Sequence, residues 1–234
     1  TLPDGTKYSD ACKAANARGE LPENVTIVRL HRTATPGERN VNATQVNGRN
    51  SLTVEGIVES ELLLRQQVQP IMEFLRKTAP GFKNARFKSS ASTLGVRETR
   101  RFIGEYVLSD TDVEVGARFE DVVVHKAWFL IDIHNPAGGG QAEKRSQPAT
   151  PYDIPYRSLI PLEIDGLLLS GRNISGTHRA HASYRVMGVA LATGQAAGTA
   201  AALSALGCCT PRQLDYRKVQ EALMDYGTQL FQET

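Results

Sequence analysis

The sequence predicts an α/β protein, with α+β character in its first two thirds, and three features support this fold class. Short segments rich in β-branched residues are separated by turn residues, which is typical of strands. Residues 64–75 carry apolar side chains at a helical spacing. The last third contains a strand, a glycine-containing loop and a long helix of small residues in succession. We therefore expect mixed or antiparallel strands with helices first, and then a strand–loop–helix unit typical of α/β proteins.

Composition and charge exclude several classes of protein. The 234 residues are 41% hydrophobic and 22% charged, which supports a sizeable globular core rather than a disordered or fibrous chain. The formal net charge is only +2, whereas proteins that bind nucleic acids usually carry a strongly basic surface. Cys12, Cys208 and Cys209 form no CxxC motif, so we expect reduced thiols rather than a zinc site or a disulfide scaffold.

The first elements are expected to be strands joined by turns. Residues 24–31 are rich in β-branched side chains and predict a strand, and Pro36-Gly37 predicts a turn after it. Residues 41–46 and 52–54 flank Asn47-Gly48, a strong hairpin signal, so we expect a second pair of strands there.

A helix is expected next. Five apolar residues follow one helical face: Leu64, Val68, Ile71, Met72 and Leu75. Pro70 removes a backbone donor in the middle of this pattern and predicts a kink or a break into two helices. Beyond Pro80-Gly81, the best strand candidates are residues 122–124 and 128–133, followed by a glycine-rich loop over residues 135–151.

The last third is easier to divide into elements. Residues 164–170 predict a strand and residues 171–181 a loop. Ser183 can cap a long helix that ends near Leu206, where Gly207 supplies the stop. Asp215 opens a last amphipathic helix.

The long helix raises the question of a membrane span, because residues 186–211 contain no charged side chain. The run consists mostly of small residues, whereas a spanning helix needs about 20 predominantly apolar ones. Gly188, Gly194 and Gly198 each cost about 1 kcal/mol of helix propensity, a cost tolerated where a backbone or a flat ligand comes close. We therefore expect a buried helix in a protein that does not associate with a membrane.

Several segments, taken in order, resemble the signature of a family of FAD-dependent oxidoreductases. They are residues 74–82, 94–106, 154–161, 167–175, 180–187 and 194–198. The resemblance implies a flavoprotein with a glutathione-reductase-type FAD domain and an inserted substrate domain. A full member opens with a GxGxxG loop that grips the ADP half of FAD. The nearest match here, Gly138-Gly139-Gly140, lacks the third glycine and no helix follows it.

The chain therefore resembles the C-terminal portion of such an enzyme, without the N-terminal GxGxxG Rossmann segment. This implies a substrate (cap) domain over residues 1–160 of mixed or antiparallel strands and helices. Residues 161–234 would be the C-terminal part of the FAD-binding domain, with the last strand and helix of a Rossmann-like sheet. The missing N-terminal FAD-binding segment is then an expected partner, and without it we expect the chain to be inactive.

The resemblance also implies residues that hold FAD. Gly171, Arg172 and Asn173 would lie against the pyrophosphate or the ribityl chain, since glycine permits close approach and arginine pairs with phosphate. The long helix would open toward the flavin ring with Ser183, Tyr184, Arg185 and Val186, and Gly188 follows these residues. The positive end of the helix dipole would favour negative charge there. A surface arginine after a strand, and an ordinary buried helix start, remain open as alternatives.

Candidates for the substrate side are Arg97, Glu98 and His134. Arg97 and Glu98 belong to a charged cluster after Gly95, for which a solvated charged strand is the alternative. His134 ends a predicted strand and titrates near working pH, so it suits acid–base catalysis, but a structural role is equally open. His178 and His181 lie three residues apart without a completing ligand, so we expect no metal site.

These observations predict part of an FAD-dependent oxidoreductase that moves a hydride from an unidentified small-molecule substrate to flavin N5. The alternative is a non-catalytic ligand-binding or interaction domain that keeps the family shape without flavin. A membrane-associated fragment is a minor third reading. We expect no nucleic-acid partner, a cytoplasmic location because no targeting segment is visible, and self-association through apolar faces that would normally meet the missing segment.

Overall fold

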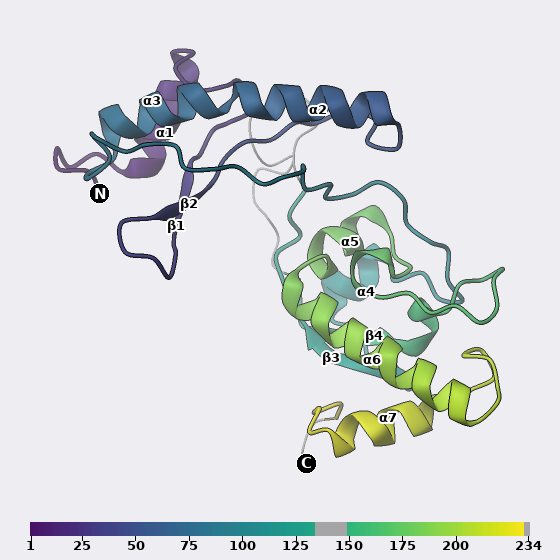
Figure 1. The fold of residues 1–234 in the computed structure, drawn as a ribbon. Coiled ribbons are helices and arrows are strands. Elements are labelled where there is room, and N and C mark those ends of the chain that lie inside the picture. Colours follow the sequence, from purple (N-terminus) through teal and green to yellow (C-terminus); the bar gives the residue numbers. More distant parts are fainter. Residues whose placement is uncertain (134–148, 232–234) are drawn as a thin grey trace. The chain divides into compact units, whose positions relative to one another are not determined.

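The computed structural model describes residues 1–133 and 149–231, and these form two compact units. The first unit comprises Thr1–Val96, and the second comprises Arg97–Ile133 together with residues 149–231 (Figure 1). Each unit has its own hydrophobic core. The predicted division at residue 160 into a substrate domain and a cofactor domain concerns function and stays a prediction.

The first unit contains three helices and one two-stranded antiparallel sheet among its described residues. Its elements are α1 (Tyr8–Ala17), β1 (Arg29–Arg32), β2 (Arg39–Asn42), α2 (Val54–Gln66) and α3 (Val68–Thr78). Leu30 lies opposite Val41 in the sheet. The core lies between α1 and α3, where Cys12, Phe74 and Leu75 are almost completely buried.

The predictions for this unit are partly confirmed. The first strand forms at the end of the predicted segment, and the turn at Pro36-Gly37 joins it to β2 with Gly37 at φ 81°. The predicted hairpin around Asn47-Gly48 is wrong. Residue 54 instead begins α2, because the Thr53 side chain accepts a hydrogen bond from the Gly56 N–H and caps that helix.

The helix predicted over residues 64–75 breaks in two, as Pro70 indicated. α2 ends at Gln66 and α3 begins at Val68, which places Pro70 in the first turn of α3, where a missing N–H is tolerated. The apolar face of α3 enters the core through Ile71, Phe74 and Leu75.

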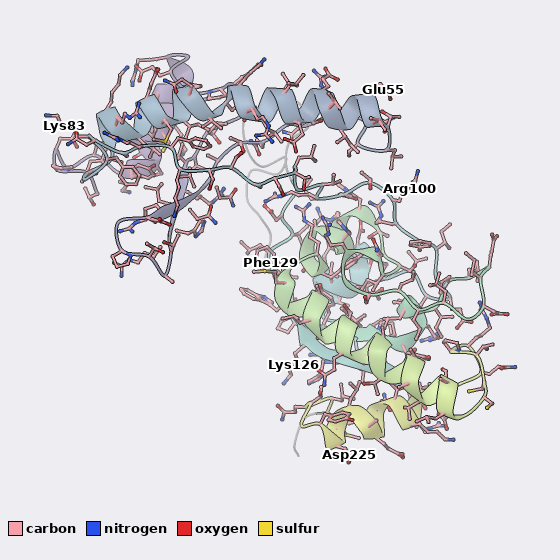
Figure 2. All side chains as sticks on the ribbon, in the orientation of Figure 1. Glu55, Lys83, Arg100, Lys126, Phe129 and Asp225 are labelled. Atoms are coloured by element: carbon pink, nitrogen blue, oxygen red, sulfur yellow. The ribbon has the colours of Figure 1, made fainter. Side chains whose placement is uncertain are left out.

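The second unit places a two-stranded antiparallel sheet among helices. Its elements are α4 (Asp110–Val115), β3 (Val122–Ala127), β4 (Tyr152–Pro155), two 3-10 turns η1 (Tyr156–Leu159) and η2 (Gly171–Asn173), α5 (His178–Tyr184), α6 (Met187–Leu206) and α7 (Tyr216–Asp225). Helices α6 and α7 pack against each other and on β3 (Figure 1). Figure 2 shows the side chains of this layered unit, from Lys126 on β3 to Asp225 at the end of α7. With its small antiparallel sheets, the described chain has α+β character.

Backbone hydrogen bonds bring the segment after Arg97 against the later part of the chain. The Leu108 N–H donates to Ser175 O and the Thr177 N–H donates to Leu108 O, which forms a parallel bridge. Gly104 forms an antiparallel bridge with Pro161. A side chain at Gly104 would come within 2.8 Å of the Ser175 Cβ, so glycine permits this approach. The segment Arg97–Leu108 is thereby placed beside α5 and η2.

Two predicted strands are absent. Residues 122–124 do begin β3, but residues 128–133 continue without a strand, and the Asp132 N–H donates to Ala182 O of α5 instead. Residues 164–170 also form no ladder; among them the Leu169 N–H donates to Leu159 O. A strand needs a continuous partner, and the described residues offer these segments none.

The long helix expected from Ser183 to Leu206 is two helices. α5 is capped by Thr177, whose side chain accepts a hydrogen bond from the Ala180 N–H, and Ser183 lies inside α5. The chain leaves the helix at Arg185, and Val186 is the N-cap of α6. The expected stop at Gly207 and the Asp215 cap of α7 are confirmed.

Among the described helices, α6 is the one long and apolar enough to cross a membrane by length and composition. Core helices of soluble proteins meet the same criterion, and Val189, Ala196 and Ala200 enter the core of the second unit. The opposite face is open: Met187 is 85% exposed and Leu191 75% exposed.

Candidate functional site

One face of α5 presents three ionisable side chains in a row. His178, His181 and Arg185 follow at intervals of three and four residues, which places them on the same side of the helix. Thr177 fixes the start of this helix, and its hydroxyl also donates to the Asp110 carboxylate on α4. The Thr177 cap therefore fixes the first turn of the helix that carries this row of side chains.

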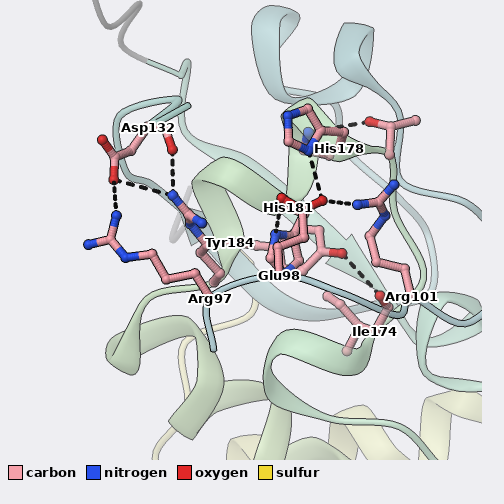
Figure 3. Close-up of polar contacts among 11 residues, drawn as sticks. Arg97, Glu98, Arg101, Asp132, Ile174, His178, His181 and Tyr184 are labelled. Atoms are coloured by element: carbon pink, nitrogen blue, oxygen red, sulfur yellow. Dashed lines mark hydrogen bonds and ion pairs between the residues drawn. The ribbon is translucent and has the colours of Figure 1, made fainter. Parts of the chain in front are cut away.

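Glu98 is the centre of the polar contacts on this face (Figure 3). Its Oε1 accepts a hydrogen bond from Arg101 and lies 2.7 Å from the His178 Nδ1. Its Oε2 lies 3.7 Å from the His181 Nδ1. The Glu98 side chain is 18% exposed, so a partly buried carboxylate faces three groups that can carry positive charge.

His181 is buried and electrically neutral at pH 7. Its side chain is 2% exposed, and its ring meets the Tyr184 ring edge-on at 5.2 Å between centroids. Burial, followed by the charges of Arg185 and Arg101, lowers the pKa of His181 to about 4. Its Nδ1 has no hydrogen-bond partner, since the Glu98 oxygen is too far away to accept one.

Asp132 holds the other end of the row. Its Oδ2 lies 3.3 Å from the Arg185 Nη2 and 3.5 Å from the Arg97 Nη1, and its backbone carbonyl also accepts a hydrogen bond from Arg185 (Figure 3). These contacts hold the Arg185 side chain, which is 11% exposed, against Asp132 at the end of α5.

Several arginines act on one another in this region. Burial and then Arg97 lower the pKa of Arg185, and Arg172 lowers it further. Arg172 and Arg101 likewise act on His181. Among the contacts of the described residues, Glu98 pairs with Arg101, and Asp132 pairs with Arg97 and Arg185. Such a cluster favours an anion, because a bound negative charge relieves the mutual repulsion of the arginines.

The turn η2 brings Arg172 to this cluster. Gly171 adopts φ 62°, a left-handed conformation that favours glycine, and its N–H donates to the Thr193 Oγ1 of α6 at 2.9 Å. Arg172 and Asn173 are exposed. Gly171, Arg172 and Asn173 thus form a tight turn that is hydrogen-bonded to the second turn of α6.

The amino end of α6 is open to solvent. Val186 provides no side-chain cap, and Met187 and Gly188 are exposed. A Cβ built on Gly188 would meet nothing within 4 Å. The first N–H groups of a helix have no partner inside the helix, so this end presents free donors and a partial positive charge.

Ser183 and Tyr184 are placed differently from the other predicted cofactor residues. Both are fully buried. The Ser183 hydroxyl donates to Phe129 O at 3.0 Å and accepts from Tyr152, and the Tyr184 hydroxyl donates to Ile174 O at 3.0 Å. Their polar groups are satisfied by the protein, and they support the site from within the core.

The structure brings Arg97 and Glu98 to the same face, whereas His134 lies outside the described residues. Sequence reasoning placed Arg101 in the charged cluster after Gly95 without a role, and it missed Asp132 and the contacts of His178 and His181 with Glu98. The available signal was the spacing of the two histidines before Arg185, which fits one helix face once α5 is known. No group of three or more metal-binding side chains is found among residues 1–133 and 149–231.

Comparison with known proteins identifies a family for this chain. The family described as FAD dependent oxidoreductase matches residues 4–223, which is most of the chain. No curated protein and no solved structure matches it significantly. The family uses FAD as its cofactor and carries out redox chemistry. By the extent of this match, the chain belongs to the family of FAD-dependent oxidoreductases.

Proposed function

We propose that the second unit holds FAD against η2 and the start of α6, and that a small-molecule substrate is oxidised beside Glu98. When bound, FAD supplies an electron acceptor that takes a hydride at N5 of its ring. The observation that carries the proposal is the open, uncapped end of α6, which follows directly on Arg185, together with the arginines that act on Arg185 and His181 from η2 and from the segment after Val96.

The residues present fit a flat, anionic cofactor. Gly188 leaves the space above the first turn of α6 empty, and Gly171 permits a tight turn beside it. Arg172 is exposed and can pair with a phosphate group, and Asn173 beside it is exposed too. Arg185 and Val186 fix the start of α6 through Asp132 and the N-cap position. Ser183 and Tyr184 contribute by supporting this backbone from the core.

The protein's own groups have separable tasks at this site. The amino end of α6 stabilises negative charge near it through the helix dipole. Arg97 and Glu98 pair with Asp132 and Arg101, and we propose that they act on the substrate side of the site. His134 remains a proposed acid–base residue. A non-catalytic domain without flavin is not favoured, because the family match points to redox chemistry.

The ADP half of FAD needs a second binding element. The sequence contains no GxGxxG loop, so we propose that a segment outside these residues supplies it. The exposed face of α6, from Met187 to Gly198, is a suitable surface for that segment. Without the segment we expect weak FAD binding and self-association through this face, which light scattering can measure.

The test is a titration of FAD into the 234-residue chain, followed by flavin fluorescence. Arg172→Ala should weaken binding about tenfold, which is the loss of one charge-assisted hydrogen bond of about 1.5 kcal/mol. Gly188→Ala should also weaken binding, although alanine at that position favours the helix itself. The matched controls are Arg217→Ala on α7 and Gly198→Ala later in α6, which should bind FAD like the wild type.

Three outcomes would contradict the proposal or a part of it. Equal affinities in Arg172→Ala, Gly188→Ala and both controls would place the cofactor elsewhere. A chain that takes up no FAD even with its natural flanking sequence would support the non-catalytic alternative. Tight stoichiometric binding by this chain alone would show that the second binding element is unnecessary.

A further inference from the structure

We propose that His178 is the proton acceptor of this site and that the substrate is an alcohol or an amine. The Nε2 of His178 takes the proton from the hydroxyl or amino group on the carbon that loses the hydride. This inference rests on the proposed function, since it assigns a residue and a substrate class to the same site.

The contact between His178 and Glu98 determines which nitrogen can accept a proton. The His178 Nδ1 lies 2.7 Å from the Glu98 Oε1, within hydrogen-bond distance. An ionised carboxylate can only accept a hydrogen bond, so the Nδ1 carries the hydrogen. In the neutral ring the lone pair then resides on Nε2. The pair is therefore oriented to accept a proton on the side away from Glu98.

Access distinguishes His178 from His181. The His178 side chain is 55% exposed, and its Nε2 makes no hydrogen bond to any described residue. The His181 side chain is 2% exposed, and it does not reach Glu98 within hydrogen-bond distance. A substrate can approach the first ring but not the second, so His178 is the available base.

Burial and neighbouring charges determine which protonation state of the His178 ring is favoured. Burial and then Arg101 and Arg185 lower the pKa of His178, so these groups favour the neutral ring before reaction. Arg179 acts in the same direction, whereas Asp110 on α4 favours the charged ring. The neutral His181 lies on the same helix face. Once His178 has accepted a proton, the adjacent Glu98 carboxylate stabilises the positive charge. Glu98 is thus a positioning residue that acts through His178.

The proposed step balances in atoms and electrons. The substrate C–H bond breaks, and its electron pair leaves with the hydrogen as a hydride to oxidised FAD. The O–H or N–H bond breaks, its proton binds His178 Nε2, and its electrons form the C=O or C=N bond. The substrate is oxidised by two electrons, and the cofactor is reduced by two. His178 later releases the proton to water.

The first test needs no cofactor and follows the imidazole nitrogens by ¹⁵N NMR in the 234-residue chain. We expect His178 above its pKa to carry its hydrogen on Nδ1, and His178→Gln identifies its signals. Glu98→Gln removes the charge and should lower the pKa of His178 by about one unit or more. A neutral ring with its hydrogen on Nε2, or a pKa that does not change in Glu98→Gln, would overturn the proposal.

The second test uses the FAD-loaded protein with its natural flanking sequence. A panel of small hydroxy acids and primary amines is mixed with it anaerobically, and bleaching of the flavin absorption is followed. His178→Ala should slow bleaching by about a hundredfold, the usual contribution of a general base, and added imidazole should restore part of the rate. The control is His31→Ala, an exposed histidine on β1, which should react like the wild type.

The outcomes separate the inference from the proposed function. If the wild type binds no FAD, both fail together. If it binds FAD but His178→Ala bleaches at the wild-type rate, only the role of His178 is wrong. If neither alcohols nor amines bleach the bound flavin, the proposed substrate class is wrong while the cofactor site stands.

Discussion

Among the described residues of the second unit, two histidines lie within hydrogen-bond distance of a carboxylate, with nearly the same local geometry but different surroundings. His178 Nδ1 lies 2.7 Å from Glu98, and His125 Nδ1 lies 2.9 Å from the Asp153 Oδ1. The His178 side chain is 55% exposed, whereas that of His125 is 10% exposed. Both pairs make the same kind of contact through Nδ1. They differ in the access to Nε2, and this difference distinguishes the pair that we propose to be reactive from the structural pair.

The closed pair, His125 and Asp153, lies in the sheet formed by β3 and β4. The register between β3 and β4 shifts between Val124 and Ala127, and Lys126 adopts φ 51° there. This bulge turns the Lys126 N–H toward the Asp153 Oδ1, at 3.1 Å. Asp153 therefore replaces a lost ladder partner, and its side chain is only 3% exposed. The His125 Nε2 is buried without a hydrogen-bond partner, so it is closed to substrate.

The largest expected effect comes from removing the buried carboxylate. Asp153→Asn should lower the free energy of unfolding by about 3 kcal/mol, because three donors lose a charged, buried acceptor. Urea unfolding followed by circular dichroism measures the loss. Glu98→Gln is the matched control, and its loss should be about 1 kcal/mol since Glu98 is more exposed. Equal losses would show that the two pairs do not differ as described.

The next effect concerns acid stability and the buried side chain of His181. The pKa of His181 is lowered to about 4 in the folded protein, below the ordinary value of 6.5. Between these values the unfolded chain binds a proton that the folded chain does not, so stability is lost as the pH falls from 6.5 toward 4. The slope should approach 1.4 kcal/mol per pH unit.

His181→Phe isolates this contribution. Phenylalanine can keep the edge contact with Tyr184 but cannot be protonated, so the decline in stability between pH 6.5 and 4 should be shallower in the variant. The measurement is the urea midpoint at half-unit pH steps. Identical pH dependence in the two proteins would mean that His181 is protonated in the folded state.

Local signals predicted some of these elements well. Residues 122–124 predicted β3, Pro70 predicted the break between α2 and α3, and Asp215 predicted the start of α7. Pro70 and Asp215 act within a few residues of the chain, because a missing N–H or a capping carboxylate produces its effect without any distant partner. The β-branched run at residues 122–124 marks a segment that also needs β4 as its partner.

The rest depends on contacts between distant segments. Arg185, at the end of α5, bonds to Asp132, which lies 53 residues away in the sequence. Glu98 and His178 are 80 residues apart, so no spacing in the sequence predicts their pairing. Arg97 and Glu98 could be proposed from the family resemblance. Their contacts with Asp132 and His178 could not be predicted from it. The bulge at Lys126 likewise has no local signal, because its cause is the Asp153 carboxylate on another strand.

The smallest effect tests whether burial or charge holds the closed pair. Arg118 Nη1 lies 3.3 Å from the Asp153 Oδ1, but its side chain is 47% exposed. Water screens such a contact, so Arg118→Ala should lower the free energy of unfolding by less than about 1 kcal/mol, and 1 M salt should reduce the difference. Arg217→Ala, at another exposed ion pair, is the control and should behave similarly. A loss in Arg118→Ala as large as that in Asp153→Asn would show that the arginine, rather than His125 and the bulge N–H, supplies most of the stabilising contact of this carboxylate. The closed pair would then be an electrostatic site accessible from the surface, and the contrast with Glu98 and His178 would no longer explain their different roles.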